Sequence, residues 1–166
     1  MTKDWAIRIG DAKDSDRLAL VGAATFLESF AGILDGDAII AHCAKQHGAG
    51  VYRDYLAGGG KAWLAEMNEG GAPIGYTLVT KPDLPGHDPD GGDLELKRIY
   101  LFSRFHGTGL GSALLDPAVE QASAAGASQL LLGVYAKNLR GLLHFLLANI
   151  YQAFGAAAQG AICHHN

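Results

Sequence analysis

Three glycines at alternate positions, Gly107, Gly109 and Gly111, stand between an apolar segment and a segment whose hydrophobic residues repeat with a helical period. This order of strand, glycine loop and helix is typical of phosphate-binding sites. Glycine has no Cβ to keep a diphosphate from the backbone, and the first N–H groups of a helix have no acceptor within the helix. The helix dipole adds about 0.3–2 kcal/mol for an anion at this end. The segment therefore predicts a site for a phosphate-bearing ligand.

The spacing of these glycines argues against two common nucleotide sites. A P-loop requires Lys and then Ser or Thr directly after its last glycine, whereas Ser112 and Ala113 follow Gly111. A dinucleotide fingerprint requires a third glycine where Ser112 stands and an acidic residue at the end of the next strand. The next apolar run, residues 129–135, ends without an acidic residue. A different class of phosphate ligand is expected.

The segment His106-Gly-Thr-Gly-Leu-Gly111 resembles motif A of the GCN5-related N-acetyltransferases, the GNAT family, in which Gln or Arg opens a glycine loop after a strand. Glu95–Leu101 looks like the fourth strand of that family, and residues 138–145 are similar to the start of its fourth helix. The resemblance extends over most of the chain. It implies a single domain over residues 1–166 with an α/β fold, in which helices flank a mixed, mostly antiparallel central sheet.

The same resemblance implies that the chain binds acetyl-CoA as its acetyl donor and uses no metal. The backbone of the fourth strand would hold the pantetheine and the thioester carbonyl, and the glycine loop would hold the diphosphate. The family's cofactor-contacting asparagine corresponds to Asn138, a residue that also suits a helix N-cap. The residues assigned to the cofactor on this basis are Ile99, Tyr100, Leu101, His106, Gly107, Thr108, Gly109, Leu110, Gly111, Ser112 and Asn138.

Acetyl transfer to an amine needs a base, because an alkyl-ammonium group has a pKa of about 10.4 and attacks only after losing a proton. The candidate base is Glu95, which stands where some branches of the family carry a catalytic glutamate. The alternative is a solvated or amine-binding carboxylate. Many members use a tyrosine of the fourth helix as the acid toward the departing thiolate, but Phe145 occupies that position. Either Tyr100, Tyr135 or Tyr151 replaces it, or the thiolate leaves without a dedicated acid.

Hydrophobic periodicity predicts the elements that position these residues. An alternating strand is expected over Trp5–Gly10, followed by a helix that Asp14 or Ser15 caps and that runs to about Phe30. A second helical region is expected over about residues 37–56, broken near 48–50, and then a hairpin of residues 61–66 and 73–80. Residues 81–92 contain three prolines and three glycines and predict an irregular loop.

The composition argues against nucleic acid and membrane as partners. The chain has 166 residues, a formal charge of −4 and a pI near 5.9, without the clustered Lys and Arg of a nucleic-acid-binding surface. No apolar run approaches the ~20 residues that a membrane span needs, and no signal peptide opens the chain, so a cytoplasmic protein is expected. Cys43 and Cys163 are too few and too far apart for a disulfide framework.

The acceptor is expected to be a small primary amine. Glu95–Leu101 and Thr25–Phe30 together look like the bacterial GNAT branch that acetylates polyamines and related amines, and Glu28, Asp35 and Asp37 would then face the polycation. The alternative function is an acetyl-CoA-binding or sensing module with little or no activity, suggested by Phe145.

The end of the chain departs from the family pattern. After residue 150 the sequence lacks the alternating apolar strands with which such domains usually finish. The last strand is therefore expected to be missing, irregular or supplied by a second subunit. An open sheet edge there would favour a homodimer.

Overall fold

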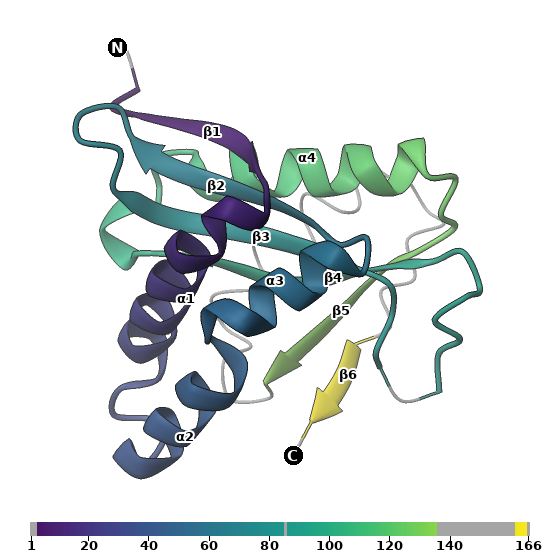
Figure 1. The fold of residues 1–166 in the computed structure, drawn as a ribbon, viewed down its shortest axis with the longest axis horizontal. Coiled ribbons are helices and arrows are strands. Elements are labelled where there is room, and N and C mark those ends of the chain that lie inside the picture. The colour runs from purple at the N-terminus through teal and green to yellow at the C-terminus, as the bar shows by residue number, and fades with distance from the viewer. Residues whose placement is uncertain (1–2, 85, 136–161, 166) are drawn as a thin grey trace.

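The computed structural model describes residues 3–84, 86–135 and 162–165, and Figure 1 shows the order of its elements. The elements are β1 (Trp5–Gly10), η1 (Ala12–Asp14), α1 (Ser15–Phe30), α2 (Gly36–Gln46), α3 (Ala49–Ala57), β2 (Lys61–Met67), β3 (Pro73–Thr80), β4 (Leu94–Leu101), η2 (Ser103–Phe105), α4 (Leu110–Ala124), β5 (Leu130–Tyr135) and β6 (Ile162–His165). Here η denotes a short 3₁₀ helix.

The strands form one sheet in the order of the chain, from β1 to β6. Neighbouring strands are antiparallel from β1 to β4, whereas β5 pairs with β4, and β6 with β5, in parallel. A parallel connection needs a crossover, and α4 supplies the one between β4 and β5. The predicted α/β fold with a mixed, mostly antiparallel sheet is confirmed.

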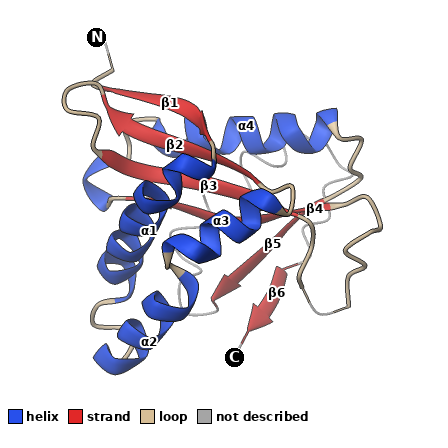
Figure 2. Ribbon diagram, in the orientation of Figure 1, coloured by secondary structure: helices blue, strands red, loops and turns tan. Residues whose placement is uncertain are grey.

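Helices cover both faces of the sheet (Figure 2). Helices α1, α2 and α3 lie on one face, and α4 packs against β2, β3 and β4 on the other. On the α4 face, Leu110, Leu114 and Leu115 pack on Leu96 and Ile99 of β4. On the opposite face a second apolar cluster joins helix to sheet; it consists of Leu18, Val21, Tyr52, Ala62, Leu64, Tyr76 and Leu78. The side chains of β4 thus divide between two separate cores.

Strands β4 and β5 pair only where β4 begins. Leu94–Leu96 lie opposite Leu130–Leu132, after which β4 continues to Leu101 beside β3 while β5 turns away toward β6 (Figure 1). The register between β3 and β4 passes over Lys97, which makes it the extra residue of a β-bulge. A bulge bends its strand and increases the local twist. Among the described strands, β4 beyond the bulge has a partner on one side only, β3.

Most predicted elements match the structure within one or two residues, including the break between α2 and α3 at Gly48. The predicted position of the α1 cap is confirmed, because Asp14 is the N-cap residue, but the expected side-chain capping bond is not formed. Asp14 makes no capping bond to α1; its carboxylate accepts two hydrogen bonds from Arg8, at 2.7 and 2.9 Å, and the side chain of Asp11 caps η1 instead. The last strand is expected from the sequence to be missing, irregular or supplied by a second subunit, whereas residues Ile162–His165 of this chain form β6, a strand of four residues that pairs with β5.

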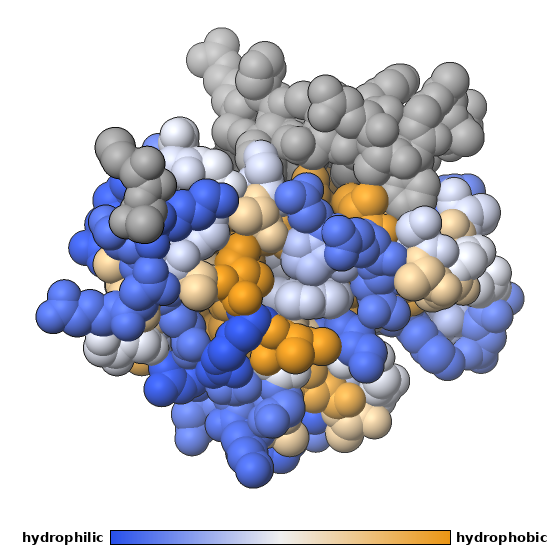
Figure 3. All heavy atoms as spheres, turned by 90° about the horizontal axis from the view of Figure 1, so that it is seen from above, coloured by the Kyte–Doolittle hydropathy of each residue, from blue (hydrophilic) through white to orange (hydrophobic). Residues whose placement is uncertain are grey.

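The face shown in Figure 3 is mainly hydrophilic, with hydrophobic side chains in separate areas. Within the described ranges, no helix has the length and apolar character that crossing a lipid bilayer requires.

Candidate active site

The glycine loop joins η2 to α4 and leaves open space in front of its backbone. Gly107 and Gly109 have φ angles of 77° and 83°, a region that residues with a Cβ rarely adopt. A Cβ placed on either glycine would meet no other atom within 4 Å. Glycine is needed here for its conformation, and the space before it is free for a ligand.

The backbone donors of this loop are available. Gly109 is the N-cap of α4 and has no side chain to cap the helix, and the Leu110 N–H donates to the Thr108 hydroxyl at 3.4 Å. Within the described ranges, the N–H groups of Gly107, Gly109, Gly111 and Ser112 donate to no other residue. Thr108 stabilises the turn by donating its hydroxyl to the Phe105 carbonyl at 2.7 Å. The arrangement fits a diphosphate.

The loop residues predicted to bind the cofactor differ in how exposed they are to solvent. His106, Gly107, Thr108 and Gly109 are exposed, whereas Leu110 belongs to the core. Gly111 is buried in the first turn of α4 and Ser112 is half-buried. Leu110 and Gly111 can therefore contribute only through their backbone.

The free side of β4 lies next to this loop in the chain. Ile99 and Leu101 place their side chains in the core under α4, and Ile99 is buried. Tyr100, between them, faces the opposite side of the sheet. An extended chain carrying amide groups can add to such a strand edge as another strand would. The geometry suits a pantetheine arm held by backbone groups, with the Ile99 and Leu101 side chains serving the core.

Glu95 is buried, with 3% of its surface exposed, at the end of β4 that still pairs with β5. Its Oε2 accepts a hydrogen bond from the Asp83 N–H at 2.8 Å, and its Oε1 lies 3.4 Å from Nζ of Lys97. The carboxylate thus ties the 81–92 loop to the sheet. At about 3.3 Å per residue, Glu95 lies roughly 13 Å along the strand from Ile99. A proton would cross that distance through water.

Tyr100 is the one candidate acid whose side chain the structure describes. Its ring stacks on Tyr76 with centroids 6.1 Å apart, and its hydroxyl makes no hydrogen bond to any described residue. Burial raises the pKa of this phenol. The other predicted residues of this kind are not described: Asn138, Phe145 and Tyr151 lie outside the described residues, and so does the side chain of Tyr135.

On the same face as Tyr100, a buried polar network joins α2, α3 and β3. The Nδ1 atom of His47 lies 2.7 Å from the Tyr52 hydroxyl, which in turn donates to the Tyr76 hydroxyl at 2.9 Å. Burial, with help from the positive charge of Arg98, lowers the pKa of His47 to about 3. Gly22 of α1 makes room for the pair, because a Cβ there would overlap the Tyr52 hydroxyl and approach His47 Nδ1 at 2.6 Å.

Arg98 of β4 sits beside this network and is 8% exposed. Its guanidinium lies over the rings of Tyr52 and Tyr55, at 5.1 and 5.5 Å from their centroids. Nη2 donates to Oε1 of Gln46 at 3.1 Å, and Nη1 has no hydrogen-bond partner in the described part of the chain. Sequence reasoning missed this cluster, although the charged residues Lys97 and Arg98 inside an apolar strand were a visible signal.

The sequence of residues 20–145 matches the family model for the acetyltransferase (GNAT) family. This chain belongs to the GNAT family. It is an acetyl-CoA-dependent N-acetyltransferase.

Several relatives support the GNAT assignment. An uncharacterized N-acetyltransferase of Mycobacterium tuberculosis is 29% identical over 127 residues, which cover 76% of each chain. The PaiA N-acetyltransferase from Thermoplasma acidophilum, solved with coenzyme A, superposes with a TM-score of 0.70 at 18% identity over 89% of each chain. A GCN5-related N-acetyltransferase from Ralstonia eutropha gives a TM-score of 0.65 at 20% identity, over 86% of this chain and 90% of that one. The two solved structures share the GNAT fold.

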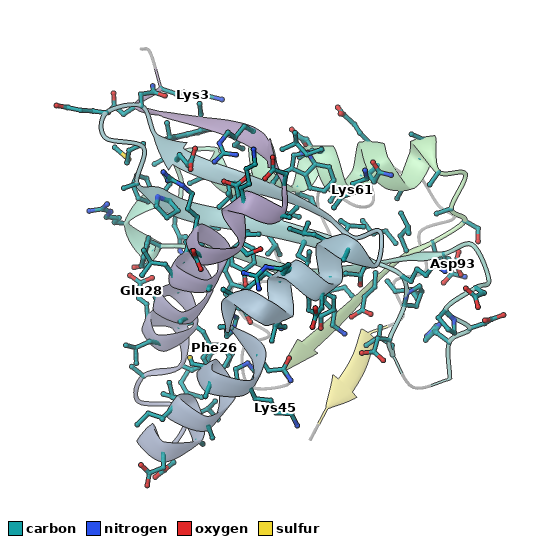
Figure 4. The ribbon with its side chains drawn as sticks, viewed as in Figure 1. Lys3, Phe26, Glu28, Lys45, Lys61 and Asp93 are labelled. Carbon is teal, nitrogen blue, oxygen red and sulfur yellow. The ribbon has the colours of Figure 1, made fainter. Side chains whose placement is uncertain are left out.

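The carboxylates expected to receive a polyamine are largely engaged in this GNAT domain. Glu28 of α1, labelled in Figure 4, accepts from both the N–H and the hydroxyl of Ser103, at 2.8 and 3.0 Å. Asp35 accepts from the N–H groups of Asp37 and Ala38 at the start of α2. Glu28 therefore links the first helix to the turn before the glycine loop.

No group of three or more His, Cys, Asp or Glu side chains that could hold a metal occurs in the part of the GNAT domain that the structure describes.

Proposed function

We propose that this chain transfers the acetyl group of acetyl-CoA to a small primary amine by direct attack within a ternary complex. The observation that carries the proposal is the succession of two features in the described part of the chain: a β4 edge that pairs with no strand beyond Lys97, and a glycine loop whose N–H groups at Gly107, Gly109, Gly111 and Ser112 donate to no residue. The loop fits a diphosphate and the edge fits an amide-bearing arm that ends in a thioester.

In this proposal, His106, Gly107, Thr108, Gly109, Leu110, Gly111 and Ser112 surround the diphosphate of the cofactor. The backbone at Ile99, Tyr100 and Leu101 binds the pantetheine arm and the thioester carbonyl. The coenzyme A complex of the Thermoplasma relative supports a cofactor role for the same fold. Asn138 remains a proposed cofactor contact from the sequence.

The proposed reaction breaks one bond and forms another. The amine lone pair attacks the thioester carbonyl, a C–N bond forms, and the C–S bond breaks to release the thiolate. Glu95 takes the proton of the ammonium form through water, and the Lys97 ammonium lies 3.4 Å from its carboxylate. The second role of Glu95, holding the Asp83 N–H, explains why its carboxylate is buried.

Tyr100 is the proposed donor to the leaving thiolate. It lies between the two residues whose backbone would hold the thioester, and burial keeps its hydroxyl protonated at neutral pH. A free thiol has a pKa of about 8.5, so a thiolate leaves tolerably even without an acid. Loss of this hydroxyl would therefore slow the reaction without stopping it.

For the acceptor, the sequence suggests a polyamine-like molecule. The engagement of Glu28 and Asp35 in local hydrogen bonds weakens that suggestion, so the proposal stays at the level of a small primary amine. A homodimer at the β6 edge also remains a proposal. Light scattering during size-exclusion chromatography tests it, and a monomer at micromolar concentration would reject it.

The experiment that tests the function measures free thiol released from acetyl-CoA against a panel of amines, alongside the dissociation constant of CoA. We expect amine-dependent release that saturates with both substrates. Tight CoA binding without release for any amine of the panel would favour the alternative, an acetyl-CoA-sensing module.

A further inference from the structure

The starting point is Arg98, a buried charge that has no counter-charge among the residues that the structure describes. An arginine stays protonated in proteins, so burial cannot be relieved by loss of its proton. A buried charge is costly unless it is paired and fully hydrogen-bonded. Arg98 is 8% exposed, and none of the described carboxylates forms an ion pair with it. Such a residue is usually retained for what it binds.

The groups that surround Arg98 are all uncharged at neutral pH. Burial raises the pKa of the phenols of Tyr52, Tyr76 and Tyr100, so they carry no negative charge. Burial lowers the pKa of His42 and of His47, the latter to about 3, and the charge of Arg98 lowers both further. The aromatic rings and one amide oxygen stabilise the guanidinium but leave its charge uncompensated.

Of the two terminal nitrogens of the guanidinium, one has a hydrogen-bond acceptor among the described residues and the other has none. Nη2 donates to the amide oxygen of Gln46, and Nη1 donates to none of the described residues. Two parallel N–H groups of arginine match the two oxygens of a carboxylate. A carboxylate that replaced the Gln46 amide would satisfy both nitrogens and neutralise the charge.

The position of the guanidinium relates it to the reaction. Arg98 directly follows the bulge at Lys97 and precedes Ile99, so it lies where β4 loses β5 as a neighbour. Its side chain is on the α1–α3 face, opposite the face that packs on α4. Its partner Gln46 is the last residue of α2, a helix that buries only Ile39. The guanidinium therefore lies between β4 and the helices α2 and α3, on the face of the sheet where we place the acceptor.

We propose that Arg98 binds the carboxylate of the acceptor, and that the acceptor is therefore an amine that also carries a carboxylate, as an amino acid does. The proposal rests on the function proposed above and narrows its substrate class. A polyamine would bring only like charges toward Arg98. The carboxylate would anchor the acceptor while its amine reaches the thioester beside Ile99.

Matched acceptors test the proposal in the wild-type enzyme. L-Lysine and cadaverine differ only in the carboxylate, as do L-phenylalanine and phenethylamine, and the amino-acid methyl esters remove the charge but keep the shape. We expect KM to be about 10- to 100-fold lower for each amino acid than for its amine or ester, as for one charged hydrogen-bonded contact. Equal KM values, or a preference for cadaverine, would overturn the proposal.

Arg98→Met separates this role from a structural one. We expect the variant to lose the preference through a rise in KM for the amino acids, with kcat for phenethylamine and the Kd of CoA unchanged. Because replacing an unpaired buried charge with an apolar side chain is often neutral or stabilising, its Tm should stay equal or rise. Arg53→Gln, on the exposed side of α3, is the control and should change none of these values. A lower Tm with equal losses for both acceptor types would show a structural role.

A binding measurement keeps the two proposals distinguishable. With CoA saturating, L-phenylalanine should raise the Tm of the wild type and leave that of Arg98→Met unchanged. If no amine releases thiol but this difference is present, the acetyl-transfer assignment fails and the carboxylate site stands. If thiol is released but L-phenylalanine shifts both proteins equally, only the carboxylate site fails.

Discussion

The two faces of β4 differ in the groups that they present. On the α4 face, the glycine loop and the strand edge offer backbone groups to a ligand, and the side chains of Ile99 and Leu110 only fill the core. On the α1–α3 face the backbone is covered, and side chains from α2, α3, β3 and β4 meet in the polar network around Tyr52 and Arg98. In the proposed site, backbone groups bind acetyl-CoA, a cofactor that does not vary. Side-chain binding can be altered one residue at a time to change the acceptor.

The two faces of β4 also differ in how well their buried groups are packed and hydrogen-bonded. The α4 face is an apolar core in which the buried Thr77 hydroxyl has a partner, the Leu114 carbonyl, at 2.7 Å. The opposite face contains buried polar groups, one unpartnered guanidinium nitrogen and a helix, α2, that buries only Ile39. Sites that bind ligands commonly carry such local costs. Variants on the two faces should therefore fail in different ways, and the following predictions use this difference.

The largest effect is expected at Gly109. Gly109→Glu places a carboxylate in the open space before the loop and forces a residue with a Cβ to adopt a φ of 83°. Repulsion of the diphosphate and loss of its hydrogen bonds should weaken CoA binding by at least about 1,000-fold in isothermal titration.

Gly126→Glu is the matched control for this variant. Gly126 also has a positive φ, 71°, and open space around it, but it lies beyond the far end of α4. Both variants should lose similar stability, and only Gly109→Glu should lose CoA. Equal CoA affinity in the two variants would remove the loop from the proposed donor site.

Glu95→Gln tests the proposed base. The glutamine can still accept from the Asp83 N–H, so the 81–92 loop stays attached while the charge is lost. At neutral pH kcat should fall by about 100-fold, the usual contribution of a general base, and should partly recover at alkaline pH as the amine deprotonates without help. A pH profile identical to that of the wild type would leave Glu95 with its structural role alone.

The donor side could be predicted from the sequence because its signal is local. A glycine loop after an apolar strand specifies its own turn, and the neighbouring residues Ile99 to Ser112 are contiguous in the chain. The strands and helices were likewise predictable from hydrophobic periodicity, since each buried face repeats along its own element. The contact of the Asp14 carboxylate with Arg8 was not, because it joins two elements across a turn.

The acceptor side could not be predicted in the same way. Gln46, Tyr52, Tyr76 and Arg98 come from four elements, and their proximity depends on how α2 and α3 lie on the sheet. Each looks ordinary in its own segment. The burial of Glu95 and the engagement of Glu28 are also consequences of tertiary packing, which periodicity does not report.

His47 gives a smaller effect, on stability. Its pKa is lowered to about 3 in the folded state, mainly by burial, against about 6.5 when unfolded. Between these values the unfolded chain binds a proton that the folded one does not, so the free energy of unfolding should decrease as the pH falls from about 6.5 toward 3. In urea titrations, His47→Asn, which can keep a bond to the Tyr52 hydroxyl, should show a weaker pH dependence in this window. An equally steep dependence in the variant would assign the acid sensitivity to other groups.

The smallest effect is expected at Glu28, the contact that joins the two sides. Glu28→Ala removes both acceptors of Ser103 and frees the turn that leads into the glycine loop. Because these bonds are exposed, the Kd of CoA should rise only about two- to fivefold, as for a contact of about 0.5–1 kcal/mol. Glu28→Gln keeps one acceptor and should give a smaller rise.

Glu69→Ala, on the exposed turn between β2 and β3, removes the same charge away from the loop and should leave the Kd unchanged. If Glu28 instead receives the acceptor, its loss should raise the KM for the amine and leave the Kd of CoA at the wild-type value. The two measurements together therefore assign Glu28 either to the support of the donor loop or to the acceptor site, and with it decide whether the division between the faces of β4 extends to α1.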